Sequence, residues 1–325
     1  MKQHHRGLID LHLHLDGSLS PASVRQLAGL QGAALPGEEA MLARLQVEPD
    51  CRDLNQYLTK FAFPCSLLQT EEAIALAVQN LCGELKAQGL LYAEIRFAPQ
   101  LHLERGLTQD RVAAAACAGL GRAGFPAGLI LCAMRGSDNR EQNLETVRVA
   151  AKYLGRGVCA CDLAGAEALF PTGDFEELFT LARKLDVPYT IHAGEAGGPE
   201  SVRAALSFGA KRLGHGVRAA EDPALVEELA VRGITLECCP TSNLHTCMFP
   251  DYRSYPLRDL LARGVKVTVN TDNMTVSGTT LSHELEALDL SREEARQVAL
   301  NAAAAAFADD NTRKALTARI EGLFV

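Results

Sequence analysis

The stretch Leu8-Ile9-Asp10-Leu11-His12-Leu13-His14-Leu15-Asp16-Gly17 reads as a β-strand in which apolar and polar side chains alternate. Side chains two positions apart in a strand point to the same face. His12, His14 and Asp16 are therefore expected to share one face. Two imidazoles on one face can bind a single metal ion, whereas a pair of histidines near a chain terminus can also be solvated and without function. The rest of the chain must decide between these two interpretations.

Seven further short apolar runs follow this stretch, and helix-like segments separate most of them. The runs lie at residues 90–98, 127–134, 157–163, 188–192, 212–217, 234–238 and 265–269, and helices are expected at residues 108–123, 140–154, 174–185, 201–208 and 222–231. Eight strands alternating with helices predict a parallel sheet and, at this number, a closed (β/α)8 TIM-type barrel of the α/β class. An open doubly wound sheet is the alternative, but no Gly-x-Gly-x-x-Gly follows the first strand.

A long segment between the first and second strands has the features of a helical insertion. Ser20 and Pro21 favour the start of a helix that ends near Gly29, and a loop follows at residues 32–37. Residues 47–63 are expected to be helical. Three aromatic side chains of this insertion can pack the core or form a lid over a pocket, and we favour the core for most of them: Tyr57, Phe61 and Phe63.

Two further helices have recognisable starts. Thr70 begins an amphipathic helix that ends near Gly89, and Ser291 with Glu294 forms a capping-box pattern before an alanine-rich helix. The sequence contains no repeat and no low-complexity linker, so we expect one barrel domain over residues 1–325.

The composition excludes several classes of protein. Of the 325 residues, 47% are hydrophobic and 22% are charged, which is ample material for a large core. The net charge is -8 and no run of Lys and Arg follows a phosphate backbone, so nucleic acid is not an expected partner. No apolar run reaches the roughly 18 residues of a membrane span, and the first dozen residues lack the apolar core of a signal peptide. The ten cysteines are scattered, as free thiols are in a reducing compartment, so we expect a cytoplasmic protein without a membrane partner.

Polar residues gather where the predicted strands end. They are His12 and His14, and then the segments 162–167, 192–195, 214–216, 239–243 and 270–273. The carboxyl ends of barrel strands converge on one mouth even when they are far apart in the sequence. Residues able to bind a metal or move a proton end five of the eight strands, which is too many for solvated loops.

The residue types at these strand ends suit zinc, which binds imidazole and carboxylate and keeps a position open for water in catalytic sites. The ligands would be three nitrogens and one oxygen, from His12, His14, His192 and Asp272. Glu195 and His215 then remain beside the metal without being needed as ligands. Because a purely structural zinc site needs no acid or base, this surplus indicates chemistry.

Other metal sites fit the sequence less well. Cys159-x-Cys161 and Cys238-Cys239 lack the Cys-x-x-Cys spacing of structural zinc. His102-Leu-Glu104 is not followed by the Pro-Cys-x-x-Cys of cytidine-deaminase-type sites. A barrel hydrolase that binds two metal ions needs a bridging ligand, typically a modified lysine at the end of strand four, where this chain has Cys161-Asp-Leu-Ala. One zinc ion per chain is therefore expected.

With these residues assembled, the sequence resembles the adenosine deaminase family of the amidohydrolase superfamily. The resemblance covers nearly the whole chain and rests on six motifs: His12-Leu-His-Leu-Asp-Gly17, Tyr92-Ala-Glu-Ile-Arg96, Asp162-Leu-Ala-Gly165, His192-Ala-Gly-Glu195, Gly214-His-Gly216 and Asn270-Thr-Asp272. It implies a mononuclear zinc hydrolase of purine nucleoside salvage that replaces the 6-amino group of a purine with oxygen and releases ammonia.

The resemblance also implies roles for single residues. His12, His14, His192 and Asp272 resemble the zinc ligands, which would make a bound water acidic enough to supply hydroxide. His215 resembles the group that orients this water and helps to deprotonate it. Glu195 resembles the acid that protonates purine N1, a role that requires a raised carboxyl pKa in a dry pocket.

The remaining roles concern the substrate. His14 would contact it as well as the metal, the backbone of Gly165 resembles the donor to N3, and Asp16 resembles the residue that holds the ribose 5′-hydroxyl. Relatives that act on adenine tend to have Glu in place of Asp16 and those that act on N6-methyl-AMP tend to have Asn, so Asp16 favours a nucleoside, either adenosine or 2′-deoxyadenosine. Asn273 departs from the second Asp of many relatives, although its amide can donate to N7 without being protonated.

Several alternatives to this function stay open from the sequence. Because of Asn273, the substrate could be a modified 6-aminopurine nucleoside or adenine. A pterin or guanine deaminase is a further enzymatic alternative. From another class, a catalytically silent barrel that only binds a nucleoside is disfavoured because both Glu195 and His215 are present. The sequence does not indicate an oligomeric state.

Overall fold

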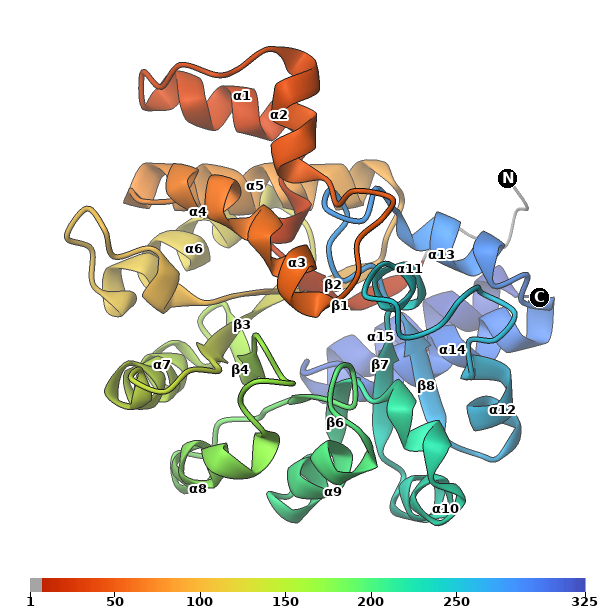
Figure 1. Cartoon of the computed structure of the whole chain (residues 1–325). Helices are drawn as coiled ribbons and strands as arrows, with labels where there is room; N and C mark the ends of the chain where they lie inside the picture. The colour runs from red at the N-terminus through yellow and green to blue at the C-terminus, as the bar shows by residue number, and fades with distance from the viewer. Residues whose placement is uncertain (1–7, 325) are drawn as a thin grey trace.

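Eight parallel strands form a closed barrel in the computed structural model, which describes residues 8–324 (Figure 1). The strands are β1 Ile9–His14, β2 Tyr92–Phe97, β3 Ala127–Met134, β4 Val158–Ala164, β5 His192–Ala193, β6 Arg212–His215, β7 Thr235–Cys238 and β8 Lys266–Val269. They form two four-stranded sheets in sequence order, β1 to β4 and β5 to β8. Single parallel bridges join the two sheets at both seams, Cys161 with Tyr189 and Leu13 with Asp272. The predicted (β/α)8 barrel is therefore confirmed, and the open sheet is excluded.

The helices that alternate with the strands lie on the outside of the barrel. They are α5 Glu71–Ala87, α6 Gln109–Ala123, α7 Arg140–Tyr153, α8 Glu176–Lys184, α9 Pro199–Ser207, α10 Pro223–Arg232, α12 Leu257–Ala262, α13 Leu281–Ala287, α14 Arg292–Ala305 and α15 Asp310–Leu323. The short helix α11 Pro240–His245 directly follows β7. The capping box at Ser291 and Glu294 is present, because each side chain accepts a hydrogen bond from the other residue's backbone.

The insertion between β1 and β2 consists of α1 Pro21–Leu30, α2 Glu38–Leu45, α3 Leu54–Leu58, a short 3-10 turn and α4 Ala62–Leu67. Figure 1 shows α1 and α2 at the top and α3 over the centre of the barrel. As predicted, Ser20 caps α1 and Thr70 caps α5, each accepting from the backbone three residues later. The predicted end of the first helix at Gly29 was early by one residue.

Two predicted elements differ from the observed ones. Residues 47–53 are not helical, because the segment contains Pro49, whose ring disfavours helix in the preceding residue, and α3 begins only after Asp53 caps it. The strand expected at 188–192 is reduced to His192–Ala193, preceded by the single bridge at Tyr189. β5 is thus too short to fix the residues that follow it by strand pairing alone.

Asp16 was predicted on the same strand face as His12 and His14, and this prediction of its conformation was wrong. The strand ends at His14 because Leu15 adopts helical dihedrals (φ -60°, ψ -52°), and Asp16 begins a 3-10 turn, Asp16–Ser18. The side chain nevertheless lines the same pocket as His14.

The core is apolar apart from a group of charged side chains inside the barrel.

All ten cysteines are free thiols, as predicted. Within residues 8–324 no single helix is long and apolar enough to cross a membrane, and one bent pair, Leu54–Leu67 with Glu71–Ala87 at 119°, qualifies by length and composition only.

Candidate active site

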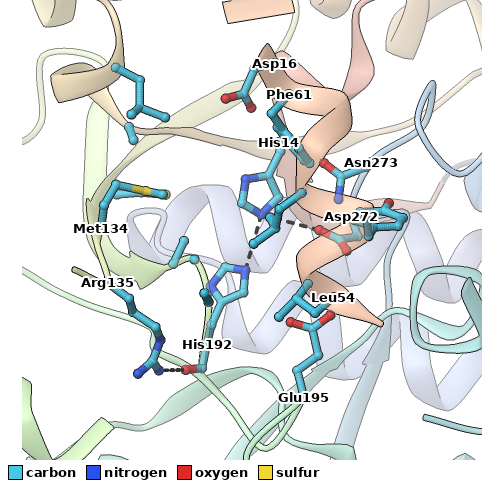
Figure 2. Close-up of a pocket in the computed structure, with 18 of the residues that line it drawn as sticks. His14, Asp16, Leu54, Phe61, Met134, Arg135, His192, Glu195, Asp272 and Asn273 are labelled. Atoms are coloured by element: carbon cyan, nitrogen blue, oxygen red, sulfur yellow. Dashed lines mark hydrogen bonds and ion pairs between the residues drawn. The ribbon is translucent and has the colours of Figure 1, made fainter. Parts of the chain in front are cut away.

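A pocket of about 320 Å³ opens at the carboxyl ends of the barrel strands. Its polar side chains come from five strand ends: His14, Asp16, Arg135, His192, Glu195, His215, Asp272 and Asn273. Apolar side chains of α3 and the following turn cover one side, namely Leu54, Leu58 and Phe61. Figure 2 shows His14, His192, Glu195 and Asp272 pointing into the same space. A flat apolar molecule with several polar atoms at its edge fits a pocket that has an apolar side and polar strand ends opposite.

The three aromatic residues of the insertion divide between the two expected roles. Tyr57 and Phe61 line the pocket, and Tyr57 is also buried, with its hydroxyl 2.6 Å from Ser277 Oγ. Phe63 packs against the core and lies beneath the guanidinium of Arg44 at 5.5 Å. The prediction that these side chains pack in the core was therefore right for Phe63, whereas Tyr57 and Phe61 also line the pocket.

Four side chains predicted as metal ligands meet at one point of the pocket. Asp272 Oδ1 lies 3.3 Å from His12 Nε2 and 3.4 Å from His14 Nε2, and His14 Nε2 lies 3.3 Å from His192 Nε2. One ligand atom from each residue lies within 4.8 Å of all the others. The strands β1, β5 and β8, far apart in the sequence, bring these four together.

This cluster has the properties of a metal site. His12 Nε2 is buried and forms no hydrogen bond, which is costly for a ring nitrogen unless another partner binds it. Asp272 has a positive φ of 58°, a strained conformation for a non-glycine residue that directs its carboxylate toward the histidines. Three imidazoles and a carboxylate are typical zinc ligands, so the residues present fit this ion.

A second possible ligand set exchanges His14 and His192 for His215 and Cys239. The thiol of Cys239, however, donates to the carbonyl of Glu237 at 3.3 Å. The set with three histidines agrees better with the donor types that zinc takes in catalytic sites.

Buried carboxylates fix the orientation of two of the histidines. His12 Nδ1 lies 2.8 Å from Glu237 Oε2, and His192 Nδ1 lies 2.8 Å from Asp162 Oδ2. The guanidinium of Arg96 bridges the two carboxylates, at 2.8 Å to Asp162 and 2.7 Å to Glu237. Burial opposes ionisation of Asp162, but the charges of His192 and Arg96 outweigh it and hold its pKa well below the usual range. Such partners outside the ligand set commonly orient metal-binding imidazoles.

Glu195 has an environment that favours the protonated form of its carboxyl. It is buried in the pocket wall, and burial, reinforced by the charges of Asp272 and Glu167, raises its pKa well above the usual range. Its Oε2 lies 3.5 Å from His215 Nε2. A group with this pKa can donate a proton to a basic atom of a bound ligand.

The tautomer of His215 follows from its neighbours. Tyr255 donates to Asn243 Oδ1 at 3.0 Å, so the amide nitrogen of Asn243 faces His215 Nδ1 at 3.1 Å and donates to it. Burial lowers the pKa of His215 well below the usual range, so the ring is neutral and its proton is on Nε2. This nitrogen can donate a hydrogen bond into the pocket.

The expected substrate residues lie around the same space. Gly165 lines the pocket; its φ of 106° favours glycine, and a side chain there would meet the terminal methyl of Met134 at 3.3 Å. Burial raises the pKa of Asp16 to about 6. Asn273 is buried, and a side chain at Gly17 would lie 1.8 Å from its Oδ1, so only glycine leaves room for this amide.

Several residues of the site had no role assigned to them from the sequence. Arg96 and Glu237 could have been noticed, because a charged residue inside an apolar strand must have a buried partner. Arg135, which lines the pocket and donates to the carbonyl of His192 at 2.5 Å, had the same signal at the end of β3 (Figure 2). Asn243 lay in the predicted polar segment 239–243 without an assigned role, and Tyr255 had no local signal, because their roles depend on contacts with another strand.

A closed parallel barrel with three histidines and an aspartate at its mouth, beside a carboxyl with a raised pKa, defines the class of metal-dependent barrel hydrolases. The comparisons narrow this class. The family model for adenosine deaminase matches residues 8–323. The chain therefore belongs to the adenosine deaminase family.

Individual relatives agree with this assignment. An adenosine deaminase of Haemophilus ducreyi is 51% identical, over 97% of this chain and 96% of that protein. An adenosine deaminase of Enterococcus faecalis is 38% identical, over 98% and 96% respectively. Among solved structures, an adenine deaminase of Arthrobacter aurescens has a TM-score of 0.86 at 27% identity and covers 98% of both chains. An amidohydrolase of Burkholderia ambifaria, solved with bound zinc, shares the fold with a TM-score of 0.88 at 22% identity, over 99% of this chain and 91% of that one.

Proposed function

We propose that this protein is an adenosine deaminase, which hydrolyses adenosine and 2′-deoxyadenosine to the corresponding inosines and ammonia. The observation that carries the proposal is the buried Glu195, whose carboxyl has a raised pKa and faces the cluster of three histidines and Asp272 across one pocket. Named adenosine deaminases that are 51% and 38% identical support the same reaction.

The metal would be held by His12, His14, His192 and Asp272, with one zinc ion per chain. Bound there, it would supply a Lewis acid that makes water nucleophilic near neutral pH. The buried carboxylates behind His12 and His192 keep the free ring nitrogens aimed at this point. Arg96 pairs with both carboxylates and helps to keep them ionised, together with His192 at Asp162 and Arg212 at Glu237.

Glu195 and His215 would act directly on the reacting atoms. Glu195 gives its proton to purine N1 while the oxygen of water bonds to C6, and the C6–N bond then breaks. Of the two protons of water, one restores Glu195 and the other leaves with ammonia. His215, with its proton on Nε2, donates to the attacking oxygen and orients it. The second expected role of His215, helping to deprotonate water, stays a prediction.

The substrate would be positioned by groups around the purine and the ribose. The backbone of Gly165 would bind N3, Asn273 would donate to N7, and Asp16 would accept from the 5′-hydroxyl. Asp16 accepts from the Gly17 N–H and the Cys65 thiol, and a ribose hydroxyl can donate to it as well, whereas adenine has no such hydroxyl, so a carboxylate at Asp16 favours a nucleoside. We further propose a single domain over residues 1–325, of which residues 8–324 are described, and a cytoplasmic location that rests on ten free cysteines.

The test is ammonia release by zinc-loaded protein with adenosine, 2′-deoxyadenosine, adenine, AMP and larger 6-aminopurine nucleosides, with metal content measured by mass spectrometry. We expect rapid conversion of adenosine with about one zinc ion per chain. Zinc binding with turnover only of a modified nucleoside or of adenine would replace the substrate and retain the chemistry. Binding of nucleosides without any turnover would overturn the enzymatic assignment.

A further inference from the structure

Glu195 lies on a short loop that the sheet does not hold. Pairing of β5 ends at Ala193, so residues 194–197, which follow directly, have no strand partner. Gly194 has a φ of 78° there, and the chain turns so that successive backbone N–H groups face the same side. The position of the Glu195 carboxyl therefore depends on whatever binds these N–H groups.

A single buried carboxylate, that of Glu167, accepts all four of them. Its Oε1 accepts from Gly194 at 2.7 Å, and its Oε2 accepts from Glu195 at 3.0 Å, Ala196 at 2.8 Å and Gly197 at 2.8 Å. The hydroxyl of Ser201 donates to Oε1 as well. Hydrogen bonds to an ionised acceptor are stronger than neutral ones, so four converging on one group restrain the loop strongly.

A glycine in the loop leaves room for the Glu167 carboxylate, and Arg218 binds carbonyl groups of the same loop. A side chain at Gly197 would lie 2.7 Å from Glu167 Oε1, so only glycine permits the close approach. Arg218 donates from Nη1 to the carbonyl of Ala196 at 2.7 Å and from its backbone N–H to the carbonyl of Gly194 at 3.1 Å. The N–H groups of the loop are thus bound by Glu167, which follows β4, and two of its carbonyls are bound by Arg218, which follows β6.

Glu167 does not act on a ligand directly. Among the described residues it is absent from the lining of the catalytic pocket and instead lines a groove behind the loop, with Gly197 and Arg218. We propose that Glu167 is a positioning residue, which sets the Glu195 carboxyl in the pocket by gathering the four N–H groups of residues 194–197. This inference rests on the proposed role of Glu195 as the acid. The charge of Glu167 also contributes to keeping Glu195 protonated.

The test compares wild type with Glu167→Gln, which has one acceptor oxygen in place of two and turns an N–H₂ group toward the loop. We expect kcat for adenosine to fall on the order of 10²-fold, with KM and metal content nearly unchanged, because a small displacement of an acid acts on the chemical step. Glu200→Gln is the matched control. Glu200 accepts a hydrogen bond from the backbone N–H of Gly198, next to the loop, and is not among the residues that contact the Glu167 carboxylate. This variant should retain wild-type kcat.

A double variant separates positioning from general damage. If Glu167 acts through Glu195, adding Glu167→Gln to Glu195→Gln should cause little further loss of kcat. A wild-type kcat in Glu167→Gln, or a double variant in which the two losses multiply, would overturn the inference. Should Glu167→Gln not fold, Gly197→Ala displaces the same carboxylate while its charge is kept, and the same reduction in kcat is expected.

Amide hydrogen exchange tests the restraint without any substrate. Exchange at residues 194–197 should be at least about tenfold faster in Glu167→Gln than in wild type and unchanged in Glu200→Gln. Unaltered exchange would overturn the inference. A wild-type protein that releases no ammonia from adenosine would instead overturn the proposed function, and the exchange result would still decide whether Glu167 holds the loop.

Discussion

His192 Nδ1 lies 2.8 Å from Asp162 Oδ2, an oxygen that also accepts a hydrogen bond from Arg96. The carboxylate therefore connects a metal-binding ring to a buried guanidinium that reaches the corresponding carboxylate behind His12. We predict that Asp162→Asn lowers metal affinity about 10- to 100-fold, because the ring loses the acceptor that sets its orientation and basicity. Competition with a chelator measures this. Asp222→Asn, at the exposed start of α10, should leave the affinity unchanged, and equal affinities in both variants would contradict the prediction.

Replacement of the catalytic acid should separate metal binding from turnover. Glu195→Gln keeps the shape of the side chain but cannot give a proton, so kcat should fall on the order of 10²- to 10⁴-fold. Metal content should remain that of wild type, because Glu195 is not among the clustered ligands. Steady-state kinetics and mass spectrometry of the same preparation check both statements. Turnover near the wild-type rate would remove Glu195 from the mechanism.

Two carboxyls should set the pH dependence of kcat/KM for adenosine, in opposite directions. Burial raises the pKa of Glu195 well above the usual range, and its active form is protonated, so activity is lost as pH rises through that raised value. Burial raises the pKa of Asp16 to about 6, and its binding form is ionised, so activity is lost as pH falls through about 6. A pH profile of Asp16→Asn should lack the acid limb near 6 and keep the alkaline one. An acid limb that is the same in Asp16→Asn would show that another group produces it.

Much of this site could be predicted because its metal ligands lie at or near the carboxyl ends of three strands, β1, β5 and β8. The eight apolar runs predicted the barrel, and barrel geometry then brings His12, His192 and Asp272 together without knowledge of any contact. The arrangement around Asp16 could not be predicted, because the alternation of residues 8–17 continues past the point where Leu15 leaves the strand. The prediction that Asp16 lies at the same site as His14 was right, although the strand conformation expected for it was wrong.

Glu167 lay in the predicted polar segment 162–167, but the roles of residues that act through long-range contacts could not be predicted from the sequence. Glu167 binds backbone N–H groups 27 to 30 positions away, and backbone donors have no signature in side-chain identity. Residues 47–53 were predicted to be helical together with residues 54–63, whereas Pro49 and the cap at Asp53 are local signals against a helix there. Contacts between strand ends, as between Asn243 and His215, follow only once the barrel is closed.

The ribose contact can be tested with two substrates. Asp16→Ala removes the acceptor proposed for the 5′-hydroxyl and should raise KM for adenosine by about tenfold or more, the cost of one charge-assisted hydrogen bond. Any residual activity toward adenine, which has no ribose, should change much less. Equal losses for the two compounds would remove the ribose role. A retained metal content shows that the neighbouring ligand His14 is undisturbed.

Asn273 gives a prediction in which pH distinguishes an amide from a carboxyl. Asn273 is buried next to Asp272 in the sequence, and its amide can donate to purine N7 at any pH. An aspartate in the same place donates only when it is protonated, and burial beside an existing carboxylate favours the protonated form only up to its raised pKa. In Asn273→Asp, KM for adenosine should therefore stay low at acidic pH and rise on the order of tenfold as pH increases, while the wild-type KM shows no such rise. With 7-deazaadenosine, in which carbon replaces N7, the two proteins should behave alike. Parallel KM profiles with adenosine would mean that residue 273 makes no hydrogen bond to the purine, and the departure from the family's second aspartate would then have no consequence for binding.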